Sequence, residues 1–85
     1  MEIDLNKLTE HKDLIGCVVK EHGIDKEGKL SGFKIENGFL SIYDTNGYIG
    51  GVNVEYGRAY LGGDNNLYIT GAYCPTFVVY TKEKQ

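Results

Sequence analysis

This sequence of 85 residues has one arginine, one proline, two cysteines and no tryptophan. The single arginine, Arg58, matters because arginine is the residue best suited to bidentate recognition of phosphate. The formal net charge is −3 at pH 7, and the lysines are scattered among acidic residues. Affinity for nucleic acid comes mainly from cationic side chains that neutralise phosphates. The composition therefore disfavours binding to nucleic acid.

Long hydrophobic runs are also absent. A transmembrane helix needs about 18 or more consecutive apolar residues. A secretory signal needs a positively charged start before its apolar stretch, whereas this N-terminus carries Glu2 and Asp4. We therefore expect a cytoplasmic protein without a membrane segment, in the host cytoplasm if a phage encodes it. In that compartment we expect Cys17 and Cys74 to be thiols, although the sequence does not decide whether they are paired.

Motifs for catalysis, metals and cofactors do not occur either. Two glycine-rich stretches, 47–51 and 57–63, lack the following helix that phosphate-binding loops require. His11 and His22 do not have the spacing of metal-ligand pairs. Asp64 stands beside two asparagines, which makes a poor calcium site. We predict a protein that is not an enzyme, with no catalytic residue, metal or cofactor.

Turn signals are the main feature that the sequence does contain, and they recur about every nine or ten residues. They are Asn37-Gly38, Asn46-Gly47, Tyr56-Gly57, residues 62–66 and Cys74-Pro75. Asn-Gly between alternating apolar residues is a strong hairpin signal. The pattern predicts one mainly β domain over residues 1–85, at the margin of the α+β class. We expect a single antiparallel meander of about six or seven short strands, curled into a small barrel or roll.

Pairing across two-residue turns at Asn37-Gly38 and Tyr56-Gly57 tests this prediction, because apolar residues should share a face. The predicted pairs are Phe33 with Ile42, Lys34 with Ser41, Ile35 with Leu40, Glu36 with Phe39, Val52 with Leu61, Val54 with Ala59 and Glu55 with Arg58. For the connection from Asp44 to Gly47 we favour a four-residue loop that pairs Ile42 with Ile49. A two-residue loop is the alternative.

The N-terminal segment differs from the rest of the chain. Asp4 is a plausible N-cap, and Leu5 and Leu8 share a helical face, so we predict a short helix over residues 4–11. A first strand is predicted over residues 14–19, and residues 82–85 are predicted to be a frayed tail. The predicted core comprises Ile15, Val18, Phe33, Ile35, Leu40, Ile42, Val52, Val54, Leu61, Ile69, Phe77 and Val79.

Seven tyrosines are the most suggestive excess in the composition. Tyrosine is enriched at interfaces, although its preference for strands explains the excess equally well. The candidate binding surface comprises Tyr48, Tyr56, Arg58, Tyr60 and Tyr68, with Tyr60 opposite Tyr68 across the 62–66 loop. We predict a small acidic binding module that acts on a protein partner, such as an accessory or inhibitor protein of a phage or mobile element.

The alternative is a homo-oligomer that binds or sequesters a nucleotide. In that reading tyrosines stack on the base, and Gly50-Gly51 lets a ligand approach the backbone closely.

Overall fold

The computed structural model describes residues 1–71 and 76–81, which form a mainly β structure as the sequence predicts. Its strands are β1 (Glu2–Ile3), β2 (Val18–Glu21), β3 (Gly28–Glu36), β4 (Phe39–Asp44), β5 (Gly47–Asn53), β6 (Arg58–Leu61), β7 (Leu67–Thr70) and β8 (Thr76–Tyr80). The helical segments of this part are two 3-10 helices, η1 (Leu5–Glu10) and η2 (Lys12–Leu14). No helix within it is long and apolar enough to span a bilayer.

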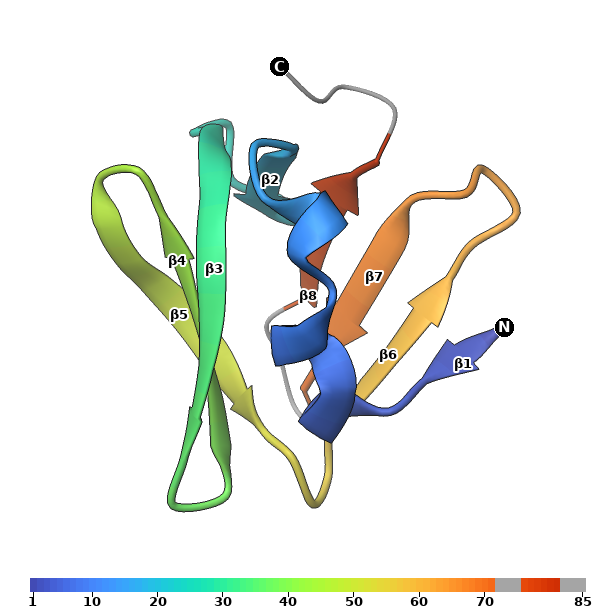
Figure 1. Cartoon of the computed structure of the whole chain (residues 1–85). Helices are drawn as coiled ribbons and strands as arrows, with labels where there is room; N and C mark the ends of the chain where they lie inside the picture. Colours follow the sequence, from blue (N-terminus) through green and yellow to red (C-terminus); the bar gives the residue numbers. More distant parts are fainter. Residues whose placement is uncertain (72–75, 82–85) are drawn as a thin grey trace.

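The strands form one antiparallel sheet in the order β1-β6-β7-β8-β2-β3-β4-β5. The predicted barrel is wrong, because the sheet stays open with β1 and β5 at its edges. The predicted single meander is also wrong, because β8 pairs with β2 and β1 pairs with β6. Figure 1 shows the two halves of the sheet: β3, β4 and β5 form one, and β1, β6, β7, β8 and β2 form the other. The 3-10 segment, which comprises η1 and η2, lies between them in this view.

The core lies on the inner side of this bent sheet, where the 3-10 segment covers it. Its buried members are Leu5, Leu8, Leu14, Cys17, Val19, Leu30, Leu40, Ile42, Val52, Ala59, Leu67, Ile69, Phe77 and Val79. Six predicted core residues are among them: Leu40, Ile42, Val52, Ile69, Phe77 and Val79. Four more predicted residues, Phe33, Ile35, Val54 and Leu61, are only half-buried and pack against this core.

The hairpin at Asn37-Gly38 is confirmed with the predicted register. Ile35 lies opposite Leu40, and the other predicted pairs of β3 and β4 also form. Asn37 and Gly38 have φ angles of 56° and 76°. A type I′ turn needs positive φ at both central residues, and asparagine followed by glycine adopts this conformation readily.

The predicted hairpin at Tyr56-Gly57 does not form. β5 pairs with β4, whereas β6 pairs with β1 and β7, so the chain crosses from one half of the sheet to the other at this point. Asn53 organises the crossing locally: its side chain accepts a hydrogen bond from the Glu55 N–H at 2.8 Å, and its carbonyl accepts one from the Gly57 N–H at 2.7 Å. The pairs predicted across this turn, including Glu55 with Arg58, are therefore wrong.

The connection between β4 and β5 is the two-residue loop Thr45-Asn46, and not the favoured longer loop. Asp44 stabilises this tight turn by accepting a hydrogen bond from the Asn46 N–H at 2.7 Å. A shift of register follows, so that Ile42 lies opposite Gly50 and Ile49 has no partner of its own on β4. Such a bulge bends the strand.

The N-terminal segment is a 3-10 helix rather than the predicted ordinary helix. Asp4 caps it as predicted, because its carboxylate accepts a hydrogen bond from the Asn6 N–H. The predicted strand over 14–19 begins only at Val18, since the chain first turns at Ile15 and Gly16, where Gly16 has a φ of 96°. The turn leaves Ile15 44% exposed and places Val18 outside the core. The prediction that Ile15 and Val18 are core residues is therefore wrong.

Some predictions fall on residues that are not described. The Cys74-Pro75 turn and the tail at 82–85 lie outside the described residues, as does any pairing of Cys17 with Cys74. Cys17 itself is buried, with its sulfur 4.0 Å from the Thr81 carbonyl oxygen.

Candidate functional site

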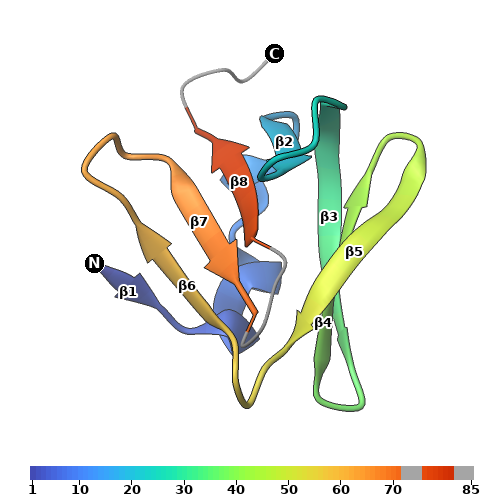
Figure 2. The ribbon, with the colours of Figure 1, turned by 180° about the vertical axis from the view of Figure 1, so that it is seen from behind.

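The outer face of the β6-β7-β8-β2 half carries a continuous row of side chains. Tyr60 lies opposite Tyr68, Tyr68 opposite Val78, and Val78 opposite Lys20. Neighbouring residues of these strands, such as Ala59, point to the core instead, because successive side chains of a strand alternate between faces. Figure 2 views the molecule from this side and shows η1 and η2 behind β7 and β8, so neither helix covers the row.

Tyr60 and Tyr68 lie opposite each other, as predicted, and their rings are stacked. Their centroids are 5.5 Å apart and their planes differ by 14°. The Tyr68 hydroxyl donates a hydrogen bond to the Asp64 carboxylate at 2.7 Å. This bond lowers the pKa of Asp64 and raises the pKa of Tyr68, because it stabilises the charged carboxylate and the neutral phenol. The two rings are thus held in place by each other and by the 62–66 loop.

Val78 shows how closely the outer face is packed. It is only 2% exposed, although it lies outside the core cluster and on the solvent side of the sheet. Tyr68 is its cross-strand neighbour, and Tyr80 follows two positions later on the same face. We call Tyr60, Tyr68, Val78 and Tyr80 the tyrosine patch. Tyr80 was not among the predicted surface residues, although residues two apart on a strand lie on the same face and Tyr80 follows Val78 by two positions.

Arg58 lies on the same face of β6, two residues before Tyr60. Its guanidinium forms an exposed ion pair with Glu2, with a nitrogen–oxygen distance of 3.0 Å. Glu2 is itself the β1 residue opposite Tyr60. The arginine therefore borders the tyrosine patch, but its charge is already compensated by a carboxylate.

The other two predicted tyrosines lie elsewhere. Tyr48 is on β5 and contacts Tyr43 edge to face, with ring centroids 5.8 Å apart. Tyr56 belongs to the crossing between β5 and β6. The structure thus brings together Arg58, Tyr60 and Tyr68 from the predicted surface.

Gly50-Gly51 does not open the backbone to a ligand. A Cβ atom at Gly50 would lie 2.6 Å from Cζ of Phe77, and one at Gly51 would lie 2.7 Å from Cε2 of Phe39. At Gly50 the ring of Phe77 fills the space, and at Gly51 the nearest atom is the backbone carbonyl oxygen of Leu40. The described residues also bring together no group of three histidine, cysteine, aspartate or glutamate side chains that could hold a metal ion.

Known proteins offer no guide to this surface. No protein-family model matches the sequence, and no curated protein or solved structure shows significant similarity to it.

Proposed function

We propose that this protein is a small non-catalytic binding module that attaches to a protein partner through the tyrosine patch. The observation that carries the proposal is the close-packed aromatic layer on a sheet face that neither 3-10 helix covers. Tyrosine combines a large apolar ring with a polar tip, which suits a surface that is wet when unbound and buried when bound.

The order within the patch also supports binding. Association costs free energy when rotatable side chains are immobilised at an interface. Here the stacking of Tyr60 on Tyr68, and the bond from Tyr68 to Asp64, restrict the rings before a partner arrives. A partner would therefore lose less free energy to side-chain ordering than it would on a mobile surface.

The nucleotide-sequestering alternative receives less support from the same surface. Arg58 is paired with Glu2, and Asp64 adds a second carboxylate beside Tyr68. Phosphate binding requires cations, and the two cations next to the patch, Arg58 and Lys20, are matched in number by the carboxylates of Glu2 and Asp64. A role as an accessory or inhibitor protein of a phage remains a prediction from composition.

The test compares immobilised wild-type protein with two variants in affinity capture, followed by titration of the captured partner. Tyr60→Ala removes an exposed ring of the patch, whereas Tyr56→Ala removes an exposed ring of the crossing between β5 and β6, outside the patch. Interface tyrosines that act as hot spots contribute about 2 kcal/mol or more, which corresponds to about a thirtyfold loss of affinity. We expect this loss for Tyr60→Ala only.

Circular dichroism should show that both variants keep the wild-type fold. Equal affinity of the two variants for the captured partner would refute the assignment of the patch. Failure of the wild-type protein to retain any partner above the background of an inert bead would refute the proposed function.

A further inference from the structure

Asp44 is the one charged residue that is buried in the described part of the chain, with 6% of its surface exposed. It ends β4, and one carboxylate oxygen, Oδ1, accepts the Asn46 N–H of the following turn. The carboxylate also packs so closely against Gly28 that a Cβ atom there would collide with it. A buried carboxylate is costly unless hydrogen bonds or an opposite charge compensate it.

The second oxygen of Asp44 is reached from a pocket. No described residue forms an ion pair with Asp44, and Oδ1 takes its one side-chain hydrogen bond. Yet no fully buried side-chain oxygen or nitrogen in the described part lacks a partner. Oδ2 accepts no hydrogen bond from the described residues and is therefore not fully buried, although Gly28 packs against it on one side; Asp44 lines a pocket of about 240 Å³.

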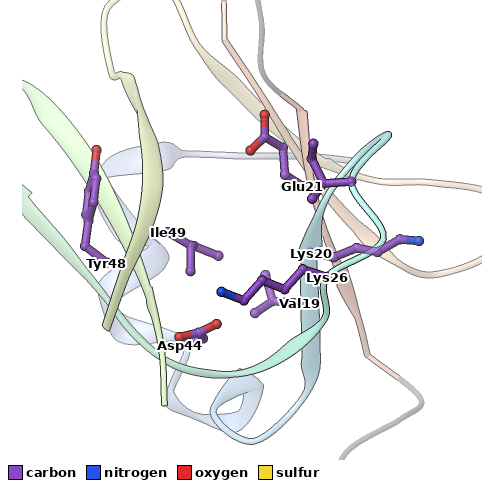
Figure 3. Close-up of a pocket in the computed structure, with 8 residues that line it drawn as sticks. Val19, Lys20, Glu21, Lys26, Asp44, Tyr48 and Ile49 are labelled. Atoms are coloured by element: carbon purple, nitrogen blue, oxygen red, sulfur yellow. The ribbon is translucent and has the colours of Figure 1, made fainter. Parts of the chain in front are cut away.

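The walls of this pocket combine the apolar side chains of Val19, Ile24 and Ile49 with the charged ones of Lys20, Glu21 and Lys26. Val19 and Ile49 lie on the side of the pocket where Asp44 stands, and Tyr48 lies at its edge (Figure 3). Lys20 starts from the outer face of the sheet, opposite Val78. Lys26 is the lysine that extends over Asp44 in Figure 3. Lys26 comes from the loop between β2 and β3 and approaches Asp44 without forming an ion pair.

We propose that this pocket binds an alkylammonium group, whose charge meets Oδ2 of Asp44 and whose methylene groups lie against Val19, Ile24 and Ile49. The side chain of Lys26 has this same chemistry and reaches over the same carboxylate. It is therefore an internal competitor for the site. The pocket is separate from the tyrosine patch, so the proposal does not depend on the proposed function.

Two sources could supply such a group: a free small amine or a lysine side chain of another protein. The probes are n-butylammonium chloride for the first source and N-acetyl-lysine N-methylamide for the second. Tighter binding of the lysine derivative would identify a protein side chain as the source, and tighter binding of butylammonium would identify a free amine. Either result supports the shared chemistry.

Binding is measured from the backbone amide NMR shifts of Asn46 and Tyr48. A partly exposed ionic contact, together with the burial of a few methylene groups, predicts a dissociation constant of about 1 to 50 mM. Sodium butyrate, which has the same alkyl chain with a negative charge, should cause no saturable shift. Absence of saturation with both amines, or equal saturation with butyrate, would overturn the proposal.

Variants then test the two named charges. Asp44→Asn keeps an acceptor for the Asn46 N–H and should abolish binding. Asp64→Asn is its matched control, because Oδ1 of Asp64 accepts the Asn66 N–H in a similar turn at an exposed position. That control should bind like the wild type.

Lys26→Met keeps most of the aliphatic stem and removes the competing charge. We expect about fivefold tighter binding, because a positive charge that repels the bound ammonium group is removed. If Asp44→Asn does not fold, Lys26→Met still tests whether the pocket at Asp44 binds the amine. Unchanged or weaker binding of butylammonium to Lys26→Met would refute the site.

Discussion

Gly50 is the position where the bend of the sheet can be tested most directly. It lies on β5, with a φ of 147°, and the fully buried Phe77 of β8 packs against its backbone. A Cβ atom at this position would lie 2.6 Å from Cζ of Phe77. The absence of a side chain at Gly50 therefore lets the two halves of the sheet meet.

The cost of Gly50→Ala has two parts. Holding an L-residue in this region of φ costs about 1 to 3 kcal/mol. Inserting a methyl group into a filled core costs about another 1 to 3 kcal/mol, because the ring of Phe77 is enclosed and cannot move aside easily. We therefore expect the free energy of unfolding to fall by about 2 to 6 kcal/mol, a large part of the roughly 5 to 15 kcal/mol typical of a domain.

Urea unfolding followed by circular dichroism measures this change. Gly63→Ala is the matched control, because a Cβ atom at Gly63 would meet nothing within 4 Å and its φ lies outside the left-handed region. Its effect should stay within about 0.5 kcal/mol. Adding Phe77→Leu to Gly50→Ala should couple favourably with it by relieving the contact. Equal stability of Gly50→Ala and Gly63→Ala would refute the close approach of β5 and β8.

Three further predictions use the same protein. Leu8→Ala should lower the free energy of unfolding in urea by about 2 to 5 kcal/mol, because Leu8 is fully buried; a loss near zero would remove η1 from the core. Arg58→Ala should lower it by at most about 1 kcal/mol, because the ion pair with Glu2 is exposed; a loss several times larger would contradict that exposure. Carboxyl NMR should give Asp64 a pKa below the ordinary aspartate value, and Tyr68→Phe should raise it. The stabilisation from this lowered pKa is present above the pKa of unfolded Asp64 and is lost as the pH falls through the folded-state pKa; no change in Tyr68→Phe would exclude the hydrogen bond.

Local signals in the sequence predicted local structure well. The Asn37-Gly38 turn fixed both the hairpin and its register, because its two residues favour positive φ and the flanking apolar residues alternate. The cap at Asp4 was predictable for a similar reason, since a capping side chain acts within two or three residues.

Pairing between distant segments could not be predicted in this way. Tyr56-Gly57 has the spacing of a hairpin turn, but hydrogen bonds to Asn53 make it a crossing between halves of the sheet. The burial of Leu5 and Leu8 depends on the inner face of the bent sheet, which only long-range pairing creates. Strand alternation therefore predicted that Tyr60 lies opposite Tyr68 but gave no sign of the pocket at Asp44.

The position of β8 has a consequence for how the chain is made. β8 lies between β7 and β2 in the sheet, although it follows both of them in the sequence. Until β8 leaves the ribosome, β2 and β7 each lack a neighbour, and the core lacks Phe77 and Val79. Folding that depends on such distant pairing is slow compared with hairpin formation. The edge of β2 therefore lacks its β8 neighbour while β3 to β7 are made, and the two halves of the sheet can join through β8 only after it has emerged.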